Sequence, residues 1–393
     1  MKSILSVGMD VHKNSFSLCA YDGYTGEIVS ESTFASDVKL VIKFIETLKS
    51  LSLIEIKCGY EAGCLGYSLY KSLTSRGVDC VILAPTTMQV SAKNKMVKND
   101  RMDALNIAKN VASGSYKAVY VPDEEDVEIK EYIRMIHDFK KELKRVKQEI
   151  CAFVLRHGYQ YDGKSKWTMD WIRNLQMSEI QRETLNEYVA EMDNLNDKIE
   201  RFMNRIHEMY QSDRYNEKVS ELRCFKGIDT FAAMTIQVET ADFERYPNAK
   251  AYASYTGLTT GEHSSGDKNN RIGITKQGNT VIRKTLVECA QSLVKGNVYT
   301  PKSKRPKSRQ KGMDVNIIAY ADKATERLKK KYQKLIERNV PRNKAIVAVA
   351  RELACFEEWK QETSIKIEKI NERRREERLL KRQRIDDIEE LRK

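Results

Sequence analysis

The segment Val7-Gly-Met-Asp-Val-His-Lys13 places an aspartate, Asp10, at the end of an apolar run. Three further acids stand in comparable motifs: Glu61 in Cys-Gly-Tyr-Glu-Ala-Gly, then Asp100 and Asp103 in Lys-Asn-Asp-Arg-Met-Asp-Ala, which opens a helix-like stretch. Gathered at the ends of neighbouring strands and on one helix, four carboxylates would repel one another unless cations lay among them. Oxygen-rich clusters of this kind select Mg²⁺. The motifs therefore predict phosphodiester chemistry, with these catalytic metal ligands: Asp10, Glu61, Asp100 and Asp103.

The first 122 residues alternate strand and helix patterns around these acids. Turn residues at 22–23 and 25–26 separate runs with strand spacing, which predicts a three-stranded meander. Buried-strand and helical patterns then follow one another. The expected strands are 3–9, 15–21, 28–34, 54–60 and 78–83, and the expected helices are 38–48, 65–73 and one from residue 101. The succession β-β-β-α-β-α-β-α is typical of an α/β RNase H-like domain.

Other interpretations of the acids are weaker. Sugar kinases and actin-like ATPases share this topology, but their chemistry needs a second Asp-x-Gly-x-[Thr/Ser] hairpin, which the sequence lacks. Asp100 alone could cap a helix beginning at Arg101. Asp103 is harder to explain, because two like charges three residues apart on one helix destabilise each other. A metal site accounts for the quartet better than four unrelated surface carboxylates.

Residues 123–215 change to a heptad pattern. Apolar residues alternate steps of three and four in two series, Ile129 to Phe153 and Leu185 to Met209. The pattern predicts two long antiparallel helices, each about 40 Å, packed through a coiled-coil seam. It leaves open whether the seam closes within one chain or between two copies. Between the series, Trp167 and Trp171 favour a packed turn over a nucleotide-stacking platform.

Residues 216–300 combine a glycine-bearing turn with a serine-rich loop. The stretch 222–229 resembles half of a helix-hairpin-helix element, but Asp229 puts an anion where phosphate would lie, which favours a structural turn. The later Ser-Ser-Gly loop contains Ser264 and Ser265. Such a loop is commonly only a turn, although basic neighbours could seat a phosphate against a hydroxyl. The candidate nucleic-acid-binding residues here are Lys268, Arg271, Lys276 and Arg283.

Length and charge point to a multidomain protein with a polyanionic partner. The chain has 393 residues and a mass of 45.4 kDa, enough for two or three domains. Its 69 Lys and Arg against 56 Asp and Glu leave a net charge of +13. The acid-free run 302–311 predicts a flexible arm along phosphates, and the mixed-sign tail 365–393 predicts an exposed helix. The arm's candidate contacts are Lys302, Lys304 and Arg305.

Cysteine usage and hydropathy indicate the compartment. The eight cysteines form no Cys-x-x-Cys pair, so neither a zinc site nor a disulfide framework is expected. The sequence has no signal-peptide pattern and no apolar run of membrane-spanning length. We therefore expect a cytoplasmic protein without a membrane partner.

These motifs together resemble the DEDD transposases of insertion-sequence family one hundred and ten, which are related to Piv invertases. The resemblance runs roughly from Ser3 to Lys295 and includes Gly-Leu-Thr-Thr-Gly-Glu-His-Ser-Ser-Gly and Ile-Thr-Lys-Gln-Gly-Asn in the expected order. It implies a RuvC-like DEDD domain over 1–122, a coiled-coil dimerisation region over 123–215 and a mainly α transposase domain over 216–300. Residues 301–393 match no motif of the family and remain a basic segment with a charged helical tail.

The resemblance also implies a mechanism. By motif position, Ser265 would be a nucleophile that forms a covalent phosphoserine link to DNA, with Mg²⁺ held by the four acids. A structured bridge RNA would pair with donor and target DNA, and the protein would be a homodimer or homotetramer in the bacterial cytoplasm. Two positions depart from the family pattern: Thr260 replaces a frequent proline, and Asp267 replaces a small residue.

Two rival functions stay open on the residues alone. A RuvC-like resolvase would use metal-activated water, and its Ser-Ser-Gly loop would only bind phosphate. A non-catalytic nucleic-acid-binding scaffold would keep the basic surfaces with a degenerate acid site. Trapping of a protein–DNA adduct separates the recombinase from the resolvase, and Mg²⁺ binding separates both from the scaffold.

Overall fold

The computed structural model describes residues 4–51, 55–63, 65–89, 99–163, 167–262 and 271–356. The chain divides after Pro122 into two units, residues 1–122 and 123–393. Several predicted features lie outside the described residues: Ser264, Ser265, Asp267 and Lys268 in the serine loop, and the tail 365–393. Within the described residues, no helix is long and apolar enough to cross a membrane.

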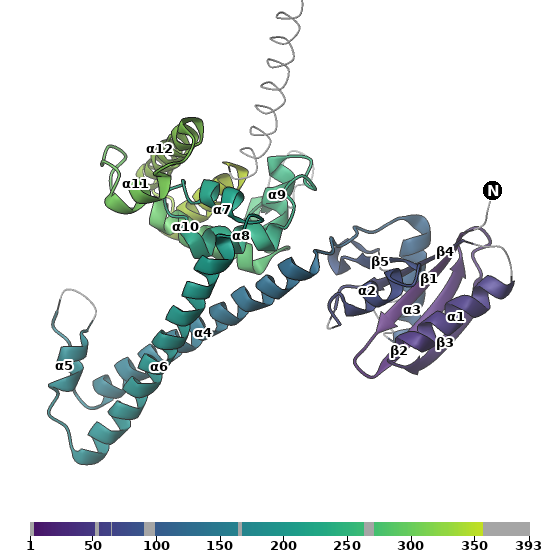
Figure 1. Ribbon diagram of the computed structural model, residues 1–393, viewed down its shortest axis with the longest axis horizontal. Helices are drawn as coiled ribbons and strands as arrows, with labels where there is room; N and C mark the ends of the chain where they lie inside the picture. The colour runs from purple at the N-terminus through teal and green to yellow at the C-terminus, as the bar shows by residue number, and fades with distance from the viewer. Residues whose placement is uncertain are drawn as a thin grey trace, which may run out of the picture. The chain divides into compact units, whose positions relative to one another are not determined.

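The first unit is built on a mixed five-stranded sheet (Figure 1). The strand order is β3-β2-β1-β4-β5, with β1 antiparallel to β2, β2 antiparallel to β3, and β1, β4 and β5 mutually parallel. Along the chain, the strands and helices follow one another in the predicted order, which confirms an α/β architecture for this unit. The strands are β1 (Ile4–Val11), β2 (Ser15–Asp22), β3 (Ile28–Ala35), β4 (Glu55–Glu61) and β5 (Asp79–Leu83).

Helices cover both faces of this sheet. Because side chains alternate along a strand, Val7 and Met9 face one side and Gly8 faces the other. The Val7 side packs against α1 (Val38–Leu51) and α2 (Ser68–Thr74). The Gly8 side is covered by α3 (Asp100–Ser113), with a short 3₁₀ turn, η1 (Pro85–Thr87), before it in the chain. Small residues on this second face let α3 lie unusually close to the strands.

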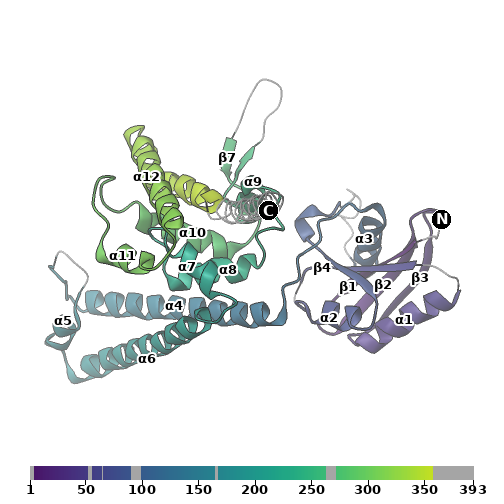
Figure 2. The ribbon, with the colours of Figure 1, turned by 45° about the horizontal axis from the view of Figure 1, so that its top comes forward.

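The second unit begins with a long helical hairpin. Helices α4 (Glu124–Arg156) and α6 (Glu179–Tyr210) lie alongside each other and are joined at their far end through α5 (Met169–Arg173) (Figures 1 and 2). The two predicted long helices are therefore confirmed, and their seam closes within one chain; supercoiling stays a prediction. The buried seam residues are Val146, Ile150, Phe153, Leu185, Met192 and Leu195.

The turn at the end of this hairpin is packed, as predicted. Trp167 donates its indole N–H to the sulfur of Cys151 at 3.0 Å. Trp171 packs edge-on against Tyr161, with ring centroids 5.3 Å apart. Both tryptophans pack against the apolar cluster of the seam, so this geometry does not resemble a platform for stacked bases.

A helical domain completes the second unit around α8 (Thr230–Thr240), whose eleven residues are all buried. Its core also takes the starts of α4 and the end of α6, so the hairpin and the domain share apolar contacts. Residues 342–356 form a further helix, and this helix and α12 contribute to the core beyond residue 300. The remaining elements are α7 (Asn216–Leu222), α9 (Ala249–Tyr255), β6 (Thr260–Glu262), β7 (Arg271–Ile274), α10 (Thr280–Leu293), α11 (Lys304–Gln310) and α12 (Val315–Glu337).

The predicted flexible arm at 302–311 is wrong. Pro306 and Gln310 of α11 are buried, and Arg309 donates a hydrogen bond to the carbonyl of Ile228. Lys302 binds the Gln310 side chain at 2.8 Å and also pairs with Asp322. The run is acid-free in sequence, yet its partners come from elsewhere in the fold, which a local charge pattern cannot register.

Candidate active site

A close approach between α3 and the sheet positions the acids of the first unit. Gly8 on β1 and Gly59 on β4 are register partners. A Cβ at Gly8 would lie 2.1 Å from the carbonyl oxygen of Ala104 and 2.2 Å from the nitrogen of Ala108. A Cβ at Gly59 would lie 2.6 Å from a methyl carbon of Val111. Glycine at position 8 lets the helix backbone rest on β1, and glycine at position 59 leaves room for the Val111 side chain.

Asp10 and Glu61 follow these glycines on the same face of the sheet. Asp10 is two residues after Gly8, so the two share a side of β1. Met9 pairs with Tyr60 in the parallel register, which puts Asp10 and Glu61 next to each other where β1 and β4 end. The side chain of Asp10 is 16% exposed, whereas Glu61 is exposed. The register thus brings two acids from distant motifs to one edge.

The first turn of α3 supplies the other two acids. Asn99 is the N-cap, and its side chain accepts a hydrogen bond from the Met102 N–H at 2.8 Å. The alternative that Asp100 caps this helix is therefore wrong, because the helix begins one residue earlier and Asp100 is its first residue. Asp103 shares that turn, where the helix dipole favours acids.

His12 joins this cluster, although motif reasoning gave it no role. Its Nε2 lies 3.3 Å from Asp10 Oδ2 and 3.8 Å from Asp100 Oδ1. Donor atoms of Asp10, His12 and Asp100 all lie within 4.8 Å of one another. The i, i+2 spacing from Asp10 at a strand end was the available signal, because it puts both side chains on one face.

Electrostatic repulsion marks the centre of the cluster. Burial and the charges of Asp100 and Asp103 raise the pKa of Asp10, while His12 opposes that rise. A carboxylate in this position gains from a nearby cation. The mainly oxygen donor set and the excess negative charge fit a divalent ion, with Asp10, Asp100 and Asp103 brought together and Glu61 beside Asp10 in register.

An ion pair ties α3 across the sheet. Arg101, between the two helical acids, pairs with Glu31 on β3. The same carboxylate, after burial, helps to raise the pKa of the Cys19 thiol to about 12. Arg101 therefore points away from the acids toward the antiparallel edge, and it leaves the negative charge of Asp100 and Asp103 available to a ligand.

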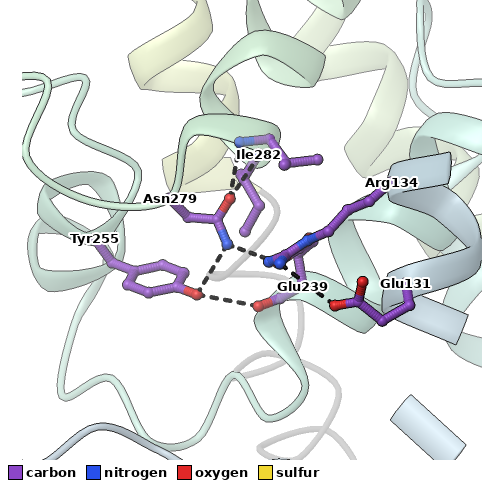
Figure 3. Close-up of polar contacts among 7 residues, drawn as sticks. Glu131, Arg134, Glu239, Tyr255, Asn279 and Ile282 are labelled. Carbon is purple, nitrogen blue, oxygen red and sulfur yellow. Dashed lines mark hydrogen bonds and ion pairs between the residues drawn. The ribbon is translucent and has the colours of Figure 1, made fainter. Parts of the chain in front are cut away.

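In the second unit, a buried carboxylate organises the residues around the serine motif (Figure 3). Glu239 of α8 is 1% exposed, and Arg134 of α4 binds both of its oxygens, at 3.0 and 3.3 Å. Asn279 donates to the same carboxylate at 2.8 Å, and Tyr255 donates to the Glu239 carbonyl at 3.1 Å. Asn279 also caps α10. Glu239 thus fixes both ends of the segment that carries the serine motif.

The predicted phosphate-binding residues take different positions. Lys276 is exposed, and Arg283 donates to the carbonyl of Thr256 at 3.1 Å. Arg271 begins β7, which pairs with β6. Lys304 and Arg305 are exposed on α11, whereas Lys302 has the partners given above.

The resemblance to half a helix-hairpin-helix resolves into a structural turn. Asp229 is the N-cap of α8 and accepts the Ala232 N–H at 2.8 Å. Gly227 has φ +96°, and a Cβ there would lie 2.4 Å from the Cys289 carbonyl oxygen. The acid and the glycine are therefore both explained by local packing, as the sequence favoured.

Family models match both units. The model of a DEDD-type transposase matches residues 7–158, and the model described as transposase IS116/IS110/IS902 family matches residues 219–304. The first match contains all four acids, and the second contains the serine motif and the capped start of α10.

Relatives match over most of their length. The "Putative transposase y4qE" of Sinorhizobium fredii is 34% identical over 298 residues, covering 76% of this chain and 73% of that protein. The transposase for insertion sequence element IS1533 of Leptospira borgpetersenii is 32% identical over 343 residues, covering 85% and 97%. The IS1111A transposase of Coxiella burnetii is 23% identical over 334 residues, covering 82% and 88%. With these matches and the acid site, the chain belongs to the IS110 family of DEDD transposases.

Proposed function

We propose that this transposase is an RNA-guided DNA recombinase that uses Mg²⁺ and a covalent phosphoserine intermediate. The observation that carries the proposal is the convergence of donor atoms from Asp10, His12 and Asp100 within 4.8 Å, although Asp10 and Asp100 come from separate motifs. Such a cluster is costly without a cation and useful with one. The residues that would hold the metal are Asp10, Glu61, Asp100 and Asp103.

The acid site would prepare a phosphodiester for attack. Bound Mg²⁺ would supply positive charge against the scissile phosphate. Asp10 and Asp100 would bind the ion, and His12 would keep the two carboxylates oriented through its Nε2 contacts of 3.3 and 3.8 Å. Arg101 holds the first turn of α3 in place through Glu31.

Ser265 would be the nucleophile of strand exchange. Its Oγ attacks phosphorus and loses its proton to solvent, while the bond from phosphorus to a deoxyribose oxygen breaks and that oxygen is protonated. The serine ester conserves the phosphodiester energy, so a second strand end can displace it without ATP. Lys268, Arg271 and Arg283 would stabilise the added charge on phosphorus. Arg283 uses one N–H on the Thr256 carbonyl and keeps further donors for phosphate.

The partners belong to the same proposal. Donor and target DNA are the substrates, a structured guide RNA selects them, and a homodimer or homotetramer in the bacterial cytoplasm carries out the exchange. Because the α4–α6 seam closes within one chain, subunit contacts would use other surfaces. Sedimentation of the purified protein with guide RNA and DNA tests the assembly, and monomers throughout would contradict it.

Substitution of Asp10 tests the metal site. Asp10→Asn removes a charge at nearly constant volume, so Mg²⁺ binding in calorimetry and strand transfer should both be lost while the fold is kept. Asp79→Asn is the matched control, because Asp79 is an exposed acid at the start of β5. Strand transfer retained by Asp10→Asn would overturn the metal assignment. If both variants bind Mg²⁺ as the wild type does, the acids do not form the metal site, and the scaffold alternative is favoured.

Substitution of the serines tests the intermediate. Ser265→Ala should abolish any protein–DNA adduct on denaturing gels, and Ser264→Ala should retain it. An adduct that survives only in Ser265→Ala would move the nucleophile to Ser264. Mg²⁺-dependent cleavage without any adduct, in the wild type as in the variants, would instead favour a resolvase that uses water.

A further inference from the structure

Two adjoining cavities form a groove in the second unit. One has a volume of about 520 Å³ and the other about 660 Å³, and both are lined by His137 and Lys141. Helix α4 makes one wall, and α10 with the start of α8 makes the other. Figure 2 shows α8 beside α4, in agreement with their direct contacts. We call this the α4–α10 groove.

Lysines from both walls face the groove. Lys140, Lys141 and Lys144 come from α4, and Lys284 comes from α10. Lys141 lies 3.6 Å from Asp138 on its own helix. Within the described residues, no carboxylate lies at ion-pair distance from the other three lysines. Asp229 and Glu288, the two acids in the wider cavity, offset part of this charge, but the four lysines outnumber them.

Burial makes the crowding of positive charge costly. Lys140 Nζ lies 3.6 Å from the centroid of the Phe231 ring and 3.8 Å from Met203 Sδ. Burial lowers the pKa of Lys140; the charges of Asp229 and Glu288 oppose this shift, and the charge of Lys284 adds to it. Burial and both lysines lower the pKa of His137 to about 4. An anion in the groove would stabilise the positive charge at these buried positions.

Two polar atoms in the groove lack partners within the described structure. Thr285 is 4% exposed and its Oγ1 is buried without a hydrogen bond. His137 Nε2 is likewise buried and unpaired. Leaving a buried polar atom unpaired is unfavourable, so each of these two atoms calls for a partner from outside the described residues. Both residues line the wider cavity, where an acceptor oxygen could bind the Thr285 hydroxyl.

The groove is long enough for several phosphates. It is lined along α10 from Thr280 to Ser292, which spans about 18 Å at 1.5 Å per residue. Along the axis of a duplex, that length corresponds to about five base-pair steps of 3.4 Å. The positive end of the α10 dipole, at Asn279, opens into the groove as well. Repeated positive charge along a line fits a polyanion better than one small acid.

We propose that the α4–α10 groove binds the sugar–phosphate backbone of a nucleic acid strand. This inference rests on the proposed function only in taking nucleic acid as the partner. The groove begins at Gly278 and Asn279, where the serine-motif segment ends, and its four lysines lie outside that segment. It would hold a strand against the shared base of the hairpin and the helical domain. DNA and guide RNA present the same backbone chemistry, so binding experiments with each identify the source.

Charge reversal tests the groove. In the full chain, Lys144→Glu combined with Lys284→Glu should weaken the binding of labelled duplex DNA or of transcribed RNA at least about tenfold. The slope of log affinity against log salt concentration should become less steep by about two. The control, Lys323→Glu with Lys334→Glu, makes the same charge change at exposed positions on α12 and should change affinity less than about twofold. Unchanged binding of both probes by the groove variant, or equal losses in both variants, overturns the proposal.

A second variant separates binding from folding. Thr285→Val removes the unpaired hydroxyl at nearly constant shape, so urea unfolding of the free protein should show equal or greater stability. Affinity for the nucleic acid whose binding the charge reversal weakens should nevertheless fall several-fold. Full affinity with raised stability would mean that the hydroxyl has no ligand and would count against the site. These binding measurements do not depend on adduct formation. The groove can therefore be tested even if the phosphoserine mechanism is wrong, and the two failures can be told apart.

Discussion

The acid cluster of the first unit and the α4–α10 groove of the second unit concentrate charge of opposite sign. Around Asp10, burial and the charge of Asp100 raise a carboxyl pKa. Around His137, burial and the charges of Lys284 and Lys140 lower an imidazole pKa to about 4. Each unit therefore contains repulsion that a ligand of the other sign would remove: a cation in the first, a polyanion in the second.

The two regions are assembled differently. Asp10 and Glu61 meet because two parallel strands share a register, so short motifs are sufficient to bring them together. In the second unit, Arg134 meets Glu239 across 105 residues of sequence, and Arg134 lines the narrower cavity of the groove. Local patterns can therefore reveal the first site, whereas the second emerges only from tertiary packing.

The largest expected effect comes from the seat of α3. Gly8→Ala would force a Cβ to within 2.2 Å of backbone atoms of Ala104 and Ala108, neither of which can rotate away. We expect a loss of about 3 kcal/mol in the free energy of unfolding, at the upper end of overpacking costs. Urea denaturation of the first unit measures it. Gly63→Ala is the control, because its nearest neighbour is the Glu61 oxygen at 3.7 Å, and an equal loss there would contradict the role of α3 packing.

The matching change in the second unit removes the partner of Glu239. Arg134→Ala leaves a carboxylate that is 1% exposed with Asn279 as its remaining side-chain donor among the contacts described. We expect a loss of about 2 kcal/mol, below the range for fully buried pairs because Arg134 is itself half-exposed. Arg145→Ala on the same helix removes an exposed arginine that also contacts two carboxylates, and should cost less than about 1 kcal/mol. Equal costs in urea denaturation would mean that burial does not distinguish the pairs.

Much of the first unit was predictable because its signals are local. The alternation around Val7 and Met9 defined a strand, and the motif ends located Asp10 and Glu61. The position of His12 against Asp100 was not predictable, since it depends on where α3 begins over the sheet. Asn99 was also missed as the cap, because the neighbouring acids drew the boundary one residue too late.

The second unit was predictable only in outline. Heptad spacing found α4 and α6, but the sequence could not say that their seam closes within one chain. The basic run at 302–311 suggested an arm, whereas Arg309 and Lys302 bind groups far away in sequence. Charge in a sequence shows what a residue can pair with; only the fold shows whether a partner is there.

A pH profile would test the crowding of charge around His137. Its pKa is about 4 in the folded chain against an ordinary 6.5, because burial, Lys284 and Lys140 outweigh Glu239 and Asp138. Below pH 6.5 the unfolded state takes up a proton that the folded state refuses, so this contribution is present above 6.5 and is lost as pH falls toward 4. Between pH 7 and 5, wild type should lose about 1.5 kcal/mol more stability than His137→Gln, after a discount for partial solvent access. If urea denaturation gives the two proteins the same dependence of stability on pH, the charges around His137 do not destabilise its protonated form, and the proposed repulsion in the second unit is wrong.

The smallest effect concerns the cap beside the acids. Asn99→Ala removes the acceptor for the Met102 N–H and should lower stability of the first unit by about 1 kcal/mol. Asn99→Ser should restore most of it, because serine caps as well. Asn99→Asp also caps, but it adds a negative charge next to Asp100, so without Mg²⁺ it should be less stable than Asn99→Ser, and Mg²⁺ should narrow that gap. If Mg²⁺ does not change this difference in stability, the acids at the start of α3 do not share a cation. The first unit would then contain no repulsion that a cation relieves, and its comparison with the α4–α10 groove would not hold.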